Sequence, residues 1–106
     1  MVKIIVLDSA KADFLDVLAH YRRHHTPAKV AEFKEAVKAL FADMKLFPLA
    51  GAAVPEAADL GFIVRQRLVE QVRVIYECKD EVIYVRMFLS TKSDFMDHLT
   101  RRLLRP

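Results

Sequence analysis

Four arginines, Arg65, Arg67, Arg73 and Arg86, lie in a part of the sequence that is otherwise rich in valine and isoleucine. That composition is typical of β-strands. A guanidinium group presents a rigid fork of N–H donors that matches the oxygens of a phosphate or a carboxylate. If the four side chains share one face of a sheet, they form a site for an anion, and phosphate is the best match. The alternative is an ordinary solvated face.

The turns between the strands decide which face each arginine occupies, because side chains alternate between the two faces along a strand. A two-residue turn at residues 79–80 sets Arg73 opposite Arg86. A three-residue loop at residues 69–71 sets Arg67 opposite Arg73, with Arg65 on the same face. The core face then carries Val72, Val74, Tyr76 and Cys78 of the middle strand and Ile83, Val85, Met87 and Leu89 of the last one. Like charges opposite each other destabilise a sheet, so this row of arginines favours anion binding.

The elements that must position this row follow from the apolar patterns along the chain. Asp8 or Ser9 can cap a first helix, and Thr26 with Pro27 is a strong start signal for a second. The expected elements are a strand at 2–7, helices at about 8–25 and 26–47, a loop at 48–60, strands at about 61–68, 72–78 and 81–89, and a helix after residue 93. This order, β-α-α-β-β-β-α, predicts an α+β fold. A small, mainly antiparallel sheet carries an αα-hairpin on one face and buries that face alone.

The bulk composition limits the classes of protein to which the chain can belong. Its 106 residues suffice for one domain, residues 1–106, and 54% hydrophobic against 29% charged residues exclude a disordered chain. No uncharged run approaches the length of a membrane span, and the apolar stretch after Lys3 is too short for a signal peptide. We therefore expect a cytoplasmic protein without membrane contact. The net charge of +3 suggests an anionic partner.

Metal and cofactor chemistry have little support in the residue types. His20 and His24 are four residues apart on an expected helix, a spacing that could hold a metal. No third ligand lies nearby, so we interpret them as a polar helix end. The single cysteine, Cys78, excludes an internal disulfide and has no base partner that would make it a nucleophile. We predict no metal and no cofactor.

Three segments together resemble a known group of proteins. The stretch "VRVIYECKDEVIYV" (residues 72–85) resembles the arginine-led central hairpin of the RelE/ParE superfamily, the toxins of type II toxin–antitoxin modules. "SAKADFLDVLAHY" (residues 9–21) resembles the opening helix of its plasmid-stabilisation members, and "STKSDF" (residues 90–95) lies where a basic stretch often precedes an acidic residue. The resemblance covers nearly the whole chain, including the order of the elements.

The resemblance implies a toxin of a type II toxin–antitoxin, or plasmid stabilisation, system, held in a hetero-oligomer by a cognate antitoxin. The superfamily divides by target. RelE-like members enter the ribosomal A site and cleave mRNA without a metal. They use basic residues of the second and third strands, where Arg65, Arg67 and Arg73 occupy matching positions. ParE-like members share the fold and are similar to known inhibitors of DNA gyrase.

The C-terminal end departs from the pattern of the cleaving members. These often carry an Arg or a His there with a Tyr a few residues on, whereas this chain has Lys92 and Phe95. Lysine can neutralise a phosphate, but phenylalanine cannot transfer a proton, which leaves Tyr84 and His98 as acid or base candidates. We therefore expect a ParE-like toxin that acts on gyrase. The alternatives are a ribosome-dependent mRNA endoribonuclease and a non-toxic module that binds RNA or protein. The residues alone do not decide whether the protein is an enzyme.

Overall fold

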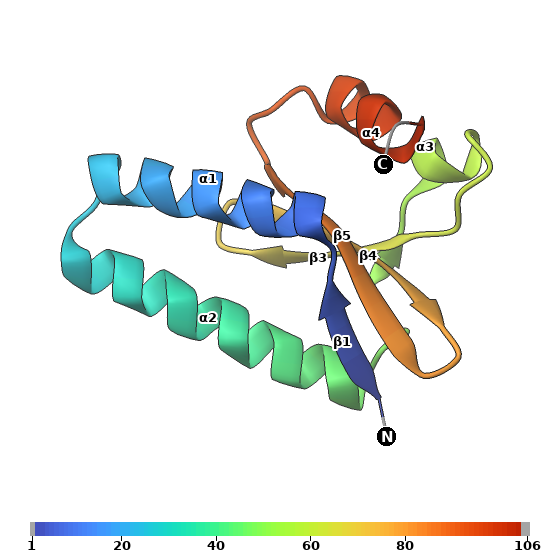
Figure 1. The fold of residues 1–106 in the computed structure, drawn as a ribbon, viewed down its shortest axis with the longest axis horizontal. Helices are drawn as coiled ribbons and strands as arrows, with labels where there is room; N and C mark the ends of the chain where they lie inside the picture. The colour runs from blue at the N-terminus through green and yellow to red at the C-terminus, as the bar shows by residue number, and fades with distance from the viewer. Residues whose placement is uncertain (1, 105–106) are drawn as a thin grey trace.

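The computed structural model describes residues 2–104, and Figure 1 shows their arrangement. The elements are β1 (Lys3–Val6), α1 (Asp8–His24), α2 (Pro27–Leu46), β2 (Ala52–Ala53), α3 (Pro55–Ala58), β3 (Arg65–Val69), β4 (Val72–Lys79), β5 (Val82–Ser90) and α4 (Phe95–Leu104). The expected order of the longer elements is confirmed. The segment expected to be a loop at residues 48–60 also contains the two-residue strand β2 and the single helical turn α3.

The strands form one sheet in the order β1-β5-β4-β3-β2. β1 runs parallel to β5, and all other neighbours are antiparallel. The α1–α2 hairpin covers one face of the sheet, and α3 and α4 lie against the other (Figure 1). The α+β class and the mainly antiparallel sheet are confirmed. A hydrophobic core on each face corrects the expectation that only one face is buried.

The helical hairpin begins as expected at its second helix. Thr26 Oγ1 accepts a hydrogen bond from the backbone N–H of Lys29 at 3.2 Å, and Pro27 follows the cap. A cap of this kind stabilises the folded protein by about 1 kcal/mol. α1 starts without a side-chain cap because Leu7 occupies the N-cap position, so the cap expected at residues 8–9 is wrong. The buried stripe of α2 consists of Val30, Phe33, Val37, Leu40 and Met44.

The β3–β4 connection is a two-residue turn at residues 70–71, where a three-residue loop was expected. Val69 pairs with Val72, so Leu68 lies opposite Arg73. Arg67 consequently lies opposite Val74, one position away from the expected register. Because side chains alternate along a strand, this shift moves the β3 side chains to the opposite face.

Glu70 makes this short turn feasible. Tight hairpin turns need positive φ angles, which glycine adopts most easily. Glu70 has φ 54°, and its carboxylate is held by the helical hairpin. It accepts a hydrogen bond from Tyr21 Oη at 2.7 Å and lies 3.4 Å from Lys29 Nζ. These contacts from distant parts of the chain stabilise a conformation that the local sequence does not favour.

The hairpin between β4 and β5 also differs from expectation. Its turn lies at residues 80–81, where Asp80 and Glu81 have φ 51° and 62°. Further along, the pairing with β4 passes from Val85 directly to Met87, so that Arg86 is an extra residue in β5. Such a β-bulge reverses the alternation beyond it. The four apolar residues expected on one face are therefore divided: Ile83 and Val85 lie beneath α1 and α2, and Met87 and Leu89 lie beneath α4.

Helix α4 is attached to the open edge of β5. β1 pairs with β5 only as far as Val85, and within residues 2–104 no strand covers the edge beyond it. There Asp13 of α1 accepts hydrogen bonds from the Phe88 backbone N–H at 3.2 Å and from Arg102 of α4 at 2.6 Å. Arg102 also donates to the Arg86 carbonyl oxygen at 3.1 Å. Side chains thus replace a strand at this edge and join α4 to α1.

Candidate functional site

The four arginines divide between the two faces of the sheet. Arg65 and Arg67 of β3 lie on the face of the α1–α2 hairpin, where Arg67 stands opposite the buried Val74. Arg73, next to Val74 in β4, points to the opposite face, and Arg86 in the bulge lies near Phe62 on that same side. The expected row of Arg67, Arg73 and Arg86 is therefore wrong. The shorter β3–β4 turn moves Arg65 and Arg67 to the other face. The shifted β4–β5 turn and the bulge in β5 set Leu89 opposite Arg73 in place of Arg86.

Both arginines on the hairpin face hold the structure together. Arg67 Nη2 lies 2.6 Å from Asp43 Oδ2, which ties β3 to α2, and its own side chain is 23% exposed. Arg65 Nη1 donates to the carbonyl oxygens of Leu49 at 3.2 Å and Gly51 at 3.0 Å. Both guanidinium groups are thus held by residues in or just after α2, although Arg67 Nη1 is buried without a hydrogen-bond partner among the described residues.

The arginines on the α4 face differ in how their charge is compensated. Arg86 Nη1 lies 3.0 Å from Glu77 Oε1 and is therefore neutralised. Arg73 Nη1 donates to the neutral Gln66 Oε1 at 2.9 Å, and its guanidinium carbon lies 4.7 Å from the centre of the Phe95 ring. Its Nε is buried without a hydrogen-bond partner. Of these two arginines, only Arg73 has no carboxylate partner among residues 2–104.

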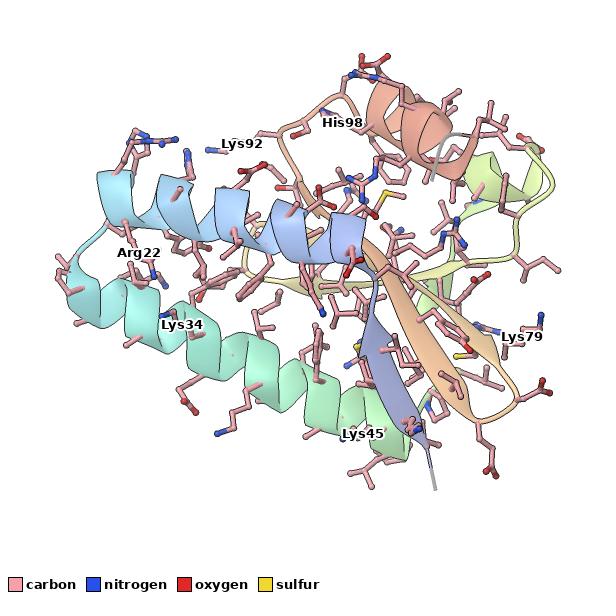
Figure 2. The ribbon with its side chains drawn as sticks, in the orientation of Figure 1. Arg22, Lys34, Lys45, Lys79, Lys92 and His98 are labelled. Carbon is pink, nitrogen blue, oxygen red and sulfur yellow. The ribbon has the colours of Figure 1, made fainter. Side chains whose placement is uncertain are left out.

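The acid and base candidates lie in two separate places. Tyr84 is opposite Glu77 and lines a small hollow of about 310 Å³ beside Lys79. Lys92 and His98 instead line a cleft of about 860 Å³ between α1 and the segment that joins β5 to α4. Figure 2 shows these two residues near one another, far from Lys79. The structure brings Lys92 and His98 together and separates them from Tyr84.

The large cleft is lined by residues that the sequence patterns did not place together. Besides Lys92 and His98, it is lined by His20, His25 and Lys29 of the helical hairpin. It also includes Gln71 of the β3–β4 turn and Ser90 at the end of β5. No local pattern could have indicated this grouping, because it depends on how three distant segments pack. The cleft is larger than the hollow beside Lys79.

Several ionisable groups around these sites have displaced pKa values. Burial, and then the hydrogen bond to Glu70, raises the pKa of Tyr21 far above its ordinary value. Cys78 is exposed and does not join the core, in contrast to the expectation. Partial loss of hydration still raises the pKa of its thiol, which argues against a nucleophile. The pKa of His20 is lowered, first by partial loss of hydration and then by positive charges nearby, of which His24 is the strongest.

The geometry limits the chemistry that the described residues can perform. Within residues 2–104, no three or more histidine, cysteine or carboxylate side chains gather as a metal site would require, so His20 and His24 have no third ligand. The three arginines matched to the cleaving toxins, Arg65, Arg67 and Arg73, do not converge on one point. What the surface offers is charge for binding, with Arg73 on one side and the cleft around Lys92 on another.

A comparison with protein families decides the relationship. The model of a family described as the ParE toxin of the type II toxin-antitoxin system parDE matches residues 4–95, which is most of the chain. The chain belongs to the ParE toxin family. The protein is therefore the toxin of a type II toxin–antitoxin system, and ParE toxins pair with a cognate antitoxin. No curated protein gives a significant match.

The matched residues include most of the candidate site residues of this ParE toxin. It covers the four arginines, Tyr84 and Lys92, and it ends at Phe95. His98 lies beyond the matched residues. The helices found in residues 2–104 are all too short or too polar to cross a membrane.

Proposed function

We propose that this ParE toxin arrests growth by binding DNA gyrase, and that it does not cleave mRNA. The observation that carries the proposal is the division of the arginines. A phosphodiester-cleaving site needs positive charge and proton-transferring groups preorganised around one phosphate. Here Arg67 is paired with Asp43, Arg65 is bound to two carbonyl oxygens, and Arg73 lies on the opposite face.

The position of Phe95 supports the same proposal. Its ring lies over the Arg73 guanidinium, where the cleaving members of the superfamily would need a group that transfers a proton. The remaining acid and base candidates, Tyr84 and His98, line different hollows. A binding mechanism needs no such groups, and the described residues assemble no acid and base near Arg73, which favours binding.

We assign the target contact on the sheet to Arg73. In the described part of the chain its charge has no carboxylate beside it, in contrast to Arg86 on the same face, which is paired with Glu77. An arginine held in place by an amide and an aromatic ring is preorganised to receive a carboxylate or a phosphate from a partner. The exposed Leu68, directly opposite Arg73 in the sheet, extends the same surface with an apolar side chain.

Induced expression in bacteria tests this proposal. Wild-type toxin is expected to arrest growth and to induce the SOS response, since a poisoned gyrase leaves broken DNA, with no cleavage of mRNA at the ribosomal A site. Arg73→Ala is expected to abolish the arrest, whereas Arg86→Ala, a matched change on the same face, retains it. Antitoxin binding and thermal unfolding of both variants serve as controls for folding. Cleaved mRNA without an SOS response would overturn the proposal.

A further inference from the structure

Five basic side chains gather where α1 ends beside the segment that joins β5 to α4. His20, Arg23, His24 and His25 belong to α1 and its C-cap, and Lys92 belongs to the other segment. The ring centres of His20 and His24 are 4.4 Å apart, and Lys92 lines the same cleft as His20. Figure 2 shows Lys92 on the opposite side of α1 from α2. These five residues are called the basic patch below.

The charge of the basic patch is not neutralised within the described chain. Neither Arg23 nor Lys92 has a carboxylate partner among residues 2–104, and both are exposed. The charged groups that lower the pKa of His20 are all positive: His24, Arg23, His25 and Lys92. The helix dipole favours basic residues in the last turn of a helix, which accounts for Arg23. It does not account for Lys92, which a separate segment brings to the same place.

The cleft beside the basic patch favours a protein segment over a nucleic acid as the partner. Its floor contains the apolar side chains of Val17, Val72, Phe88 and Leu89. The cleft is also lined by the carboxylates of Asp13 and Asp16, two turns and one turn before His20 on α1, and by Glu70, which is paired with Lys29. A nucleic-acid backbone carries evenly spaced negative charges and would be repelled there. A peptide can place carboxylates at the patch and an apolar side chain over the floor.

We propose that the basic patch is a docking surface for a carboxylate-rich segment of the cognate antitoxin, with an apolar side chain of that segment in the adjoining cleft. The antitoxin is the partner that membership in the ParE family establishes. The proposal therefore does not depend on gyrase being the target. Complementary charge across such a surface raises the rate of encounter and makes it sensitive to salt.

Charge reversal with a matched control tests the proposal. Arg23→Glu/Lys92→Glu reverses two charges in the basic patch, and Lys38→Glu/Lys45→Glu reverses two exposed charges on α2, one of them also in a last helical turn. Binding of each toxin variant to the immobilised antitoxin, the product of the adjacent reading frame, is measured at low and high salt. Two exposed ion pairs, each worth up to about a fivefold change in affinity, predict a loss of up to about 25-fold for the patch variant.

The outcomes show whether the basic patch binds the antitoxin or the target of the toxin. We expect the patch variant to lose affinity mainly through slower association and to lose most of its salt dependence, and the α2 variant to stay within about twofold of wild type. Circular dichroism confirms that both variants are folded. Wild-type affinity in the patch variant, or equal losses in both variants, would overturn the proposal. So would a patch variant that binds antitoxin normally but no longer arrests growth, because the patch would then serve the target.

Discussion

Replacing Arg102 by alanine breaks the link between α4 and the open edge of β5. The change removes the hydrogen bonds from Arg102 to Asp13 Oδ1 and to the Arg86 carbonyl oxygen. The two charged side chains are 22% and 17% exposed, so the ion pair is neither fully buried nor a surface pair. Removing one partner of a buried pair costs about 3–5 kcal/mol, and an exposed pair contributes less than about 1 kcal/mol. We expect the free energy of unfolding to fall by about 2 kcal/mol, between these limits.

The assay is urea unfolding followed by circular dichroism, with thermal unfolding beside it. A loss of about 2 kcal/mol corresponds to a fall of about 10 °C in Tm for a domain of this size. Arg101→Ala is the matched control, because Arg101 is the preceding residue and pairs with Asp97 on the exposed side of α4, where their side chains are 63% and 55% exposed. It should change stability by less than about 0.5 kcal/mol. Equal effects of the two variants would refute the assigned role of Arg102.

Two further predictions concern groups with displaced pKa values. Tyr21→Phe removes the hydrogen bond to Glu70 and should lower the free energy of unfolding by about 1 kcal/mol at neutral pH in a urea titration. Because folding raises the pKa of Tyr21 above 10.0, this contribution to stability is fully present below that pH and is lost as the pH rises further. A difference in unfolding free energy between wild type and Tyr21→Phe that stays constant up to strongly alkaline pH would contradict the assignment. For His20, NMR titration should give a pKa below 6.5 that rises in Arg23→Ala and rises less in Lys92→Ala. Unchanged values in both variants would show that these charges do not act on the ring.

Local sequence patterns were sufficient to predict most elements of the fold. The Thr26-Pro27 start signal and the apolar stripe of α2 depend only on neighbouring residues, and the structure confirms both. Strand register was predicted wrongly because the length of the β3–β4 turn was predicted wrongly. A shift of one residue then moves every side chain of the strand to the other face. The β3–β4 turn is short because Glu70 adopts a positive φ while bound to Tyr21, a residue 49 positions away. No local sequence pattern indicates that contact.

The candidate site was predictable only in part for the same reason. The segments at residues 9–21, 72–85 and 90–95 were together enough for the family resemblance, which the comparison with the ParE family confirms. The role of Arg67 depends on Asp43, which the docking of α2 onto the sheet brings within 2.6 Å. The cleft joins His20 and Lys92, whose proximity depends on the packing of α1 against β5. Site geometry of this kind follows from tertiary packing and not from residue type.

Inhibition of purified gyrase is the most direct test of the proposal that this ParE toxin binds its target without cleaving RNA. Toxin is titrated into a supercoiling reaction, and in parallel into ribosomes stalled on a defined mRNA. The account predicts that supercoiling falls with increasing toxin, that prior addition of the cognate antitoxin restores it, and that the mRNA stays intact at the same concentrations. Unimpaired supercoiling together with cleavage of the mRNA in the A site would contradict it.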